Sequence, residues 1–383
     1  MKQFFSFLLF FSFHALFAQN AVLEEADQHF ANQKYDAAEG IYTKQIEVLS
    51  PRQTANLGYC YFQKQNYDHA KPLFEKAAQQ GDAHGKRYIG YMYEQGIGGL
   101  EKDVKLALQY YQEAAELQDD IAISNLGYMY FLGVGLEQNY EKAFQHYSKA
   151  SKLGNSRAQN NLGNMYENGI FVEKDLAKAY DLYMKASETD LYAMTNLGEL
   201  YEQGIYVQAD IQTAISWYEK AAAYNHAPAQ TNLGVIYLNG LGGIEVDYEK
   251  AYKYFDQAAS QLELTAMVNI GKMNQLGLGR EKNYELAYKV FNYTAVQGNV
   301  YGQYELANLY YNGQGVEKDN AIALSIYEAA GSAGLIEAQV NAGYMYEHGE
   351  GTDTNIAEAI KWYELAAQQG NPFATERLKE LKK

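Results

Sequence analysis

The sequence predicts an all-α protein, built as a solenoid of stacked αα-hairpins. Three regularities indicate this: a Leu-Gly or Ile-Gly pair that recurs along the chain, a second glycine six positions after most of these pairs, and an Asn or Asp that precedes an alanine by four residues. The glycines of successive pairs lie 32 to 37 positions apart, which is the period of helical repeat proteins. The pairs are Leu57-Gly58, Ile89-Gly90, Leu126-Gly127, Leu162-Gly163, Leu197-Gly198, Leu233-Gly234 and Ile270-Gly271, continued by Leu306-Ala307 and Ala342-Gly343.

The first helix of each hairpin, helix A, contains the pair. An aromatic residue stands three positions after the glycine, except at Asn274, and shares one helical face with the leucine because residues four apart lie side by side. The second glycine supplies the left-handed residue that commonly ends a helix. Helix A is therefore expected to end at Gly96, Gly133, Gly169, Gly204, Gly240, Gly277, Gly313 and Gly349.

The second helix, helix B, is expected to begin at the Asn or Asp, whose side-chain oxygen can accept a hydrogen bond from the first turn. The alanine four residues later faces inward and is followed by aromatic residues. Small residues on both helices let the backbones approach while the rings fill the remaining volume. The predicted caps are Asn66, Asp103, Asn139, Asp175, Asp210, Asp247, Asn283, Asp319 and Asn355.

A signal peptide is predicted over residues 1–18, because Lys2 precedes an apolar run that ends at the small residue Ala18. The run is too short to span a membrane comfortably, so no stable span is expected after cleavage; a retained N-terminal anchor is the alternative. The expected location is the periplasm or the extracellular space.

The rest of the chain is predicted to consist of three segments, the first two of which differ in the length of the turn between helix A and helix B. Residues 19–82 lack the glycine-rich loop and form N-terminal hairpins, residues 83–371 form eight repeats of about 36 residues, and residues 372–383 form a C-terminal capping helix.

The motif Leu-Gly-x-x-Tyr-x-x-Gly-x-Gly, followed by the cap, the alanine and an aromatic pair, resembles the Sel1-like repeat over residues 83–371. Residues 19–82 resemble the related tetratricopeptide repeat. The resemblance implies a right-handed α-solenoid whose helices A line a concave surface that binds proteins. Exported bacterial members act as adaptors in envelope regulation and host interaction. A cysteine-rich subset is associated with β-lactam binding or hydrolysis, and this chain departs from it in having a single cysteine, Cys60.

Composition excludes one class of partner. The formal charge of −16 argues against nucleic acid, whose binding rests on clustered Lys and Arg. With one cysteine the fold must be stable without internal disulfides, and Cys60 is interpreted as a small core residue.

No motif for catalysis is present in the sequence. Ser-x-x-Lys, His-Glu-x-x-His, Gly-x-Ser-x-Gly and the phosphate-binding loop are all missing, so we expect neither an enzyme nor a cofactor nor a metal site. The nearest approach to a metal-ligand cluster is His348 between Glu347 and Glu350, which is interpreted as a solvated loop.

An asparagine precedes seven of the nine pairs, and Tyr88 and Glu305 interrupt the series. We call the position immediately before each pair the ladder position. An amide at this position can hold the backbone of a ligand because it both donates and accepts hydrogen bonds. The alternative is that each asparagine bridges neighbouring repeats. The candidate partner-binding members are Asn125, Asn161, Asn196, Asn232 and Asn269; Asn56 and Asn341 complete the series.

The residue after each glycine shares that face and varies between repeats, as expected of positions that select a partner. Tyr91, Tyr128, Asn164 and Glu199 are the candidates here. The sequence thus favours an exported adaptor that binds a protein or peptide on its concave face. Two alternatives stay open: a cell-wall or β-lactam hydrolase of the cysteine-rich type, and a periplasmic regulator of a membrane sensor.

Overall fold

A computed structural model describes residues 19–382, and in this part of the chain all regular structure is helical. Helices A are α3 (Pro51–Gln63), α5 (Ala83–Gln95), α7 (Asp120–Leu132), α9 (Ser156–Asn168), α11 (Leu191–Gln203), α13 (Ala227–Asn239), α15 (Leu264–Leu276), α17 (Val300–Asn312) and α19 (Ile336–His348). Helices B are α4 (Tyr67–Gln79), α6 (Val104–Glu116), α8 (Tyr140–Lys152), α10 (Leu176–Ala186), α12 (Ile211–Ala222), α14 (Tyr248–Ala259), α16 (Tyr284–Val296), α18 (Asn320–Ser332) and α20 (Ile356–Gln368).

The remaining elements lie at the ends of the chain and in one loop. A first helix over residues 19–31 is followed by α2 (Tyr35–Lys44) and the 3-10 helix η1 (Ile46–Val48); η2 (Leu241–Gly243) lies in a loop, and α21 (Pro372–Leu381) packs on α20. The predicted signal peptide lies outside the described residues. No helix within residues 19–382 has the length and apolar character needed to cross a membrane.

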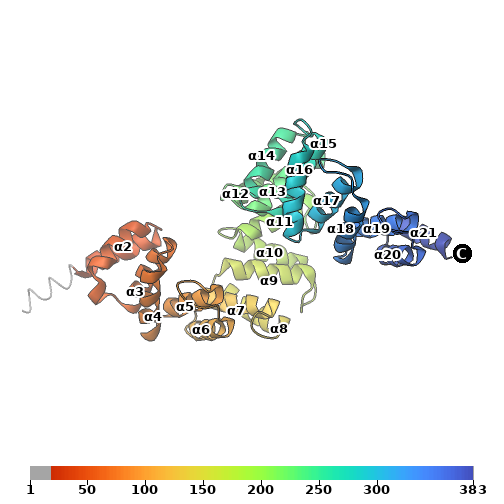
Figure 1. Ribbon diagram of the computed structural model, residues 1–383. Helices are drawn as coiled ribbons and strands as arrows, with labels where there is room; N and C mark the ends of the chain where they lie inside the picture. Colours follow the sequence, from red (N-terminus) through yellow and green to blue (C-terminus); the bar gives the residue numbers. More distant parts are fainter. Residues whose placement is uncertain (1–18, 383) are drawn as a thin grey trace, which may run out of the picture. The chain divides into compact units, whose positions relative to one another are not determined.

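The chain forms two compact units, unit 1 up to Ala193 and unit 2 from Met194 onward. Within unit 1 each helix A packs against the helix B that follows it, as Figure 1 shows for α5 with α6 and α7 with α8. Unit 2 repeats the arrangement from α13 with α14 to α19 with α20. The prediction of an all-α solenoid of αα-hairpins is confirmed.

The predicted helix ends are also confirmed, with one exception. All eight predicted glycines at the end of helix A have positive φ, between 65° and 75°. Eight of the nine predicted N-cap side chains accept a hydrogen bond from the first turn of helix B. The exception is Asn66: helix B begins directly after it, as predicted, but its side chain makes no capping hydrogen bond and its Oδ1 lies 2.9 Å from His69 Nδ1. In this tighter turn the φ of Asn66 is −85°, whereas the other caps have φ between −134° and −149°.

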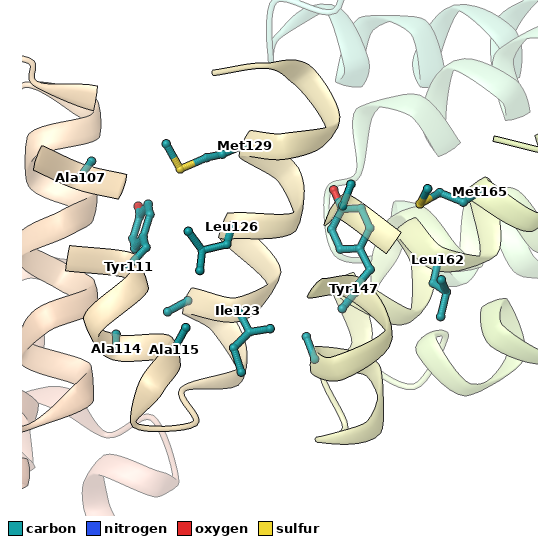
Figure 2. Close-up of a cluster of buried hydrophobic side chains, with 14 residues drawn as sticks. Ala107, Tyr111, Ala114, Ala115, Ile123, Leu126, Met129, Tyr147, Leu162 and Met165 are labelled. Carbon is teal, nitrogen blue, oxygen red and sulfur yellow. The ribbon is translucent and has the colours of Figure 1, made fainter. Parts of the chain in front are cut away.

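One contact recurs in the core of every hairpin whose pair contains glycine: an aromatic ring of helix B lies directly on that glycine of helix A. The hairpin of α17 and α18 has Ala307 at this position instead. A Cβ atom added to Gly127 would lie 2.7 Å from Cδ1 of Tyr147, and one added to Gly163 would lie 2.7 Å from Cε1 of Tyr183. The helices approach this closely because neither glycine carries a side chain. The opposite side of the ring faces the next hairpin, as Tyr111 does in pointing toward Leu126 (Figure 2).

Cys60 is a core residue, as predicted. Its side chain is fully buried within unit 1, and burial raises the pKa of the thiol to about 12. The thiol is therefore protonated at neutral pH, and a reactive thiolate is disfavoured.

We predict that Gly127→Leu lowers the free energy of unfolding by about 1–3 kcal/mol, because the new side chain must displace the buried Tyr147 ring. Gly40→Leu is the matched control: this exposed helical glycine has open space around its Cβ position, and leucine is the better helix former by about 0.8 kcal/mol. Urea unfolding followed by circular dichroism measures both variants, and equal stability of the two would contradict the proposed packing.

Candidate functional site

Helices A of unit 1 line a groove of about 640 Å³. Its walls come from α3, α5, α7 and α9 and from the first residues of α11. Four of the nine predicted site residues line it together, namely Tyr91, Asn125, Tyr128 and Asn161.

One end of the groove is aromatic. Phe62 of α3 lies 5.9 Å, between ring centroids, from both Tyr88 and Tyr91 of α5, and Tyr59 lies 5.2 Å from Tyr88. Tyr88 also stacks on the buried Phe74 ring at 4.7 Å. The result is a continuous apolar wall that Tyr91, which is exposed, extends toward solvent.

The other end is polar. Asn125 of α7 and Asn161 of α9 are half-buried, and Arg157 of α9 is exposed beside them. Tyr128 and Tyr192 bring two exposed rings to this part of the groove. Amides that donate and accept, together with tyrosines, suit contact with a peptide backbone and its side chains.

The floor between the two ends contains a buried ion pair. Arg87 Nε lies 3.0 Å from Asp119 Oδ1, and the guanidinium covers the Tyr88 ring at 4.3 Å. Burial lowers the pKa of the nearby His84 to about 4, and the positive charges of Arg87 and Arg52 act in the same direction, while Asp119 and Asp82 oppose it. At neutral pH His84 is therefore uncharged and the charge of Arg87 is balanced by Asp119.

The asparagines that precede the pairs have structural partners in several repeats. Asn56 Nδ2 lies 3.5 Å from the hydroxyl of Tyr42, the buried ring of the preceding helix B. Burial raises the pKa of Tyr147, and Asn161 opposes this through a hydrogen bond with its hydroxyl. In unit 2 Asn232 and Asn341 likewise oppose the raised pKa values of Tyr218 and Tyr327, whose hydroxyls donate to Glu202 Oε2 at 2.7 Å and to Asn308 Oδ1 at 2.5 Å. In these repeats the asparagine bridges two consecutive repeats by contacting the tyrosine hydroxyl of the preceding one.

The residue type of the aromatic ring that packs on the preceding glycine accounts for both interruptions of the series. The ladder position follows the ring of the preceding repeat by 14 residues in eight of nine cases. Where that ring is Phe74 or Phe291 and carries no hydroxyl, the ladder residue is Tyr88 or Glu305 instead of asparagine. The remaining phenylalanine, Phe255, precedes Asn269, whose Nδ2 turns back to the Thr265 carbonyl of its own helix at 3.0 Å. The type of ring and the residue 14 positions after it therefore change together in these repeats, a pattern that is visible in the sequence but does not appear when each position is considered alone.

The other predicted site residues lie outside the groove. Asn164 is half-buried in α9, where its carbonyl oxygen accepts from Asn168. Asn196, Asn232, Asn269 and Glu199 belong to unit 2, where Asn232 Nδ2 lies 3.4 Å from Glu199 Oε1. Their role in binding stays a prediction. Conversely, most residues that line the groove were absent from the predicted set, among them Tyr59, Phe62, Tyr88 and Arg157.

His348 lies far along the sequence from the groove, in unit 2. Its ring stacks on Tyr344 at 4.1 Å between centroids, and Nδ1 donates to the Tyr344 carbonyl at 2.9 Å. Across residues 19–382 no three His, Cys, Asp or Glu side chains come together in a way that could hold a metal ion.

We predict that Asn161→Ala lowers the free energy of unfolding by about 1 kcal/mol, because it removes a hydrogen-bond partner of the buried Tyr147 hydroxyl. Asn125→Ala is the matched control. Tyr111, the ring that precedes Asn125, keeps Glu94 as its acceptor at 2.6 Å, whereas the position equivalent to Glu94 beside Tyr147 is Phe131. Chemical denaturation of both variants should show the smaller loss for Asn125→Ala; the reverse order would contradict this account of the ladder.

A comparison with known protein families identifies the type of these repeats. The model of the Sel1 repeat matches residues 54–82, 83–119, 120–155, 156–188, 191–226, 227–261, 264–289, 300–335 and 336–371. The first match lies inside the segment 19–82, which the sequence analysis assigned to tetratricopeptide-like hairpins.

Two solved structures of bacterial proteins are similar along most of the chain. The protein c5321, described as a protective antigen present in uropathogenic Escherichia coli strains, is 28% identical with a TM-score of 0.65, and the match covers 95% of this chain and 80% of that one. A Sel1 repeat protein from Oxalobacter formigenes is 27% identical with a TM-score of 0.55, covering 80% and 90%.

Two curated eukaryotic proteins match a short stretch. They are HRD3 of Candida glabrata and HRD3B of Arabidopsis thaliana, both described as components of an ERAD-associated E3 ubiquitin-protein ligase. Each is 37% identical, over 75 and 79 residues respectively, which is about a fifth of this chain. The match spans 9% and 13% of the length of these relatives.

Proposed function

The chain belongs to the Sel1 repeat family, and we propose that it is an exported, non-catalytic adaptor that binds a segment of another protein in the groove of unit 1. The observation that carries this proposal is the gathering of Tyr91, Asn125, Tyr128 and Asn161 from three successive helices A into one groove. Repeat scaffolds of this type bind proteins through such surfaces because each repeat contributes equivalent positions along an extended face.

The chemistry of the groove supports protein binding. Tyrosine provides a large contact area at a low entropic cost, and it is enriched where proteins bind one another. The asparagines can pair with the carbonyl and N–H groups of an extended chain. The HRD3 relatives, which are components of a multi-protein ligase, support the same class of role through a short shared stretch of repeats.

The hydrolase alternative receives no support from the groove. Its two carboxylates are engaged, Glu94 by the Tyr111 hydroxyl and Asp190 by the backbone N–H of Ala193 at 2.9 Å. Cys60, the single cysteine, is buried. No observation favours an enzyme over a binding protein.

Export and a role at the cell envelope or toward a host rest on two observations. Residues 1–18 have the order of a signal peptide, with a basic start, an apolar run and a small residue. The similar Escherichia coli protein is a protective antigen, and we propose by analogy that this chain also leaves the cytoplasm.

Export predicts that the mature protein begins at or near Gln19. Cell fractionation followed by N-terminal sequencing tests this, and a Lys2→Glu variant, whose basic start is lost, should accumulate with its first residues attached. Recovery of the unprocessed wild-type chain in the cytoplasm would contradict export and leave the binding proposal standing.

Binding in the groove predicts site-dependent cross-linking. A photoreactive phenylalanine analogue in place of Tyr128 should capture a partner, whereas the same analogue in place of Tyr140 should not. Both tyrosines are exposed in unit 1, but Tyr140 opens helix B and does not line the groove. Equal capture at the two positions, followed by mass spectrometry, would place the interaction elsewhere.

A further inference from the structure

We propose that the groove takes an extended, largely uncharged segment with two recognition elements: an aromatic side chain bound by the α3/α5 wall, and a carboxylate about six or seven residues away that pairs with Arg157. This inference rests on the proposed function and specifies the chemistry of the partner.

Arg157 has a counterpart earlier in the chain that shows what such an arginine does when it is structural. Arg52 stands six residues before Gly58, as Arg157 stands six before Gly163. Arg52 Nε pairs with Asp82 Oδ2 at 2.9 Å, and Asp82 caps the next helix A. The charge of Arg52 is therefore balanced within the protein itself.

Arg157 differs from Arg52 in its pairing. Like Arg52 it is exposed, but it lies in the groove and belongs to none of the ion pairs of residues 19–382. Asp190 occupies the place of Asp82 in the following repeat, yet it is not paired with Arg157. The other arginine of the groove, Arg87, is balanced by Asp119. Arg157 is therefore the cation that the groove offers to a partner.

A carboxylate is the complementary group. The guanidinium presents a planar fork of donors that matches two carboxylate oxygens, and such pairs fix position as well as adding affinity. The formal charge of −16 means that the protein as a whole repels a densely acidic partner. A single unpaired arginine in the groove therefore favours a partner that carries one carboxylate over a partner that carries many. One carboxylate in an otherwise neutral segment fits this distribution.

The aromatic wall provides the second anchor. The Phe62 ring lies 5.9 Å, between centroids, from the rings of both Tyr88 and Tyr91, in a tilted and an edge-on arrangement that can accept a further ring. Buried aromatic anchors commonly supply much of the affinity of an interface.

The separation of the two anchors follows from the repeat. Tyr91 lies on α5 and Arg157 on α9, two helix A positions along the solenoid. Neighbouring packed helices lie about 8–10 Å apart, which separates the two helices by about 16–20 Å. Tyr91 stands one residue after Gly90 and Arg157 six residues before Gly163, so the anchors are also offset along the helix axis by about 10 Å at about 1.5 Å per residue. The combined separation of about 19–23 Å corresponds to about six or seven residues of an extended chain, which advances about 3.3 Å per residue. Asn125 and Tyr128 of α7 lie between the anchors and face the backbone of the segment.

The test uses synthetic peptides with acetylated and amidated ends, so that the only carboxylate is a side chain. Each contains one Trp and one Glu in a Ser/Ala background, three to eight residues apart and in both orders, and isothermal titration calorimetry with the full mature chain measures affinity. We expect tightest binding at a separation of about six or seven in one order. Replacing the Glu by Gln should weaken that peptide about fivefold.

Protein variants assign the effect to residues. Arg157→Gln should remove the difference between the Glu and Gln peptides, whereas Lys152→Gln, which removes an exposed charge outside the groove, should leave it unchanged. Tyr91→Ala should weaken both peptides equally. Asp190→Asn keeps a good helix cap and should tighten binding of the Glu peptide, because it removes a negative charge from the lining of the same groove.

Three outcomes would overturn the proposal: equal affinity of the Glu and Gln peptides for the wild type, no dependence on separation, or no binding of any peptide at millimolar concentration. A concentration-dependent dimer in sedimentation that Tyr91→Ala dissociates would likewise show that a second copy occupies the groove. Position-dependent cross-linking at residue 128 to a segment without these two groups would overturn this inference alone and leave the proposed function intact.

Discussion

The contact between a glycine of helix A and an aromatic ring of helix B is the constraint on which the other features depend. Because a Cβ on Gly127 would clash with Tyr147, the two helices can be this close only with glycine at that position. The ring is then fully covered, and where it is tyrosine its hydroxyl reaches the edge of the core and requires a partner. Glutamates such as Glu94 and asparagines such as Asn161 fill that requirement. The same packing rule therefore forms the core and places polar side chains along the surface lined by helices A.

The groove arises where the repeats depart from this rule. Phe74 has no hydroxyl, and the ladder position that follows it holds Tyr88, which stacks on the ring and joins the aromatic wall. Arg157 departs in another way, since the equivalent Arg52 pairs with a helix cap, whereas Arg157 belongs to none of the ion pairs of the described residues. In a repeat protein the regular positions maintain the fold, and the irregular ones distinguish one surface from another.

Local rules predicted the helix boundaries well. A glycine with positive φ ends helix A, and an Asn or Asp side chain caps helix B, because both effects depend on residues within one turn. Asn66 shows the limit of this approach: its turn is tighter, so the same residue type adopts another backbone conformation and bonds His69. The candidate site was predicted in part. Tyr91, Asn125, Tyr128 and Asn161 meet in the groove, but Arg157 and Tyr59 were not among the predicted site residues. Arg157 lies six positions before its glycine, outside the two positions beside the pair from which the site was predicted.

The sequence by itself determined the all-α class, the period, the hairpin and the residues at each helix end, because these depend on spacing and on the conformational preferences of single residues. Only the tertiary structure decided which ladder asparagines touch a tyrosine hydroxyl, which arginine is paired and which tyrosines share a groove. Those outcomes depend on distances between side chains in different repeats. A pair such as Arg52 and Asp82 forms at 2.9 Å while the equivalent Arg157 and Asp190 do not, although the spacing of the residues in the sequence is nearly the same.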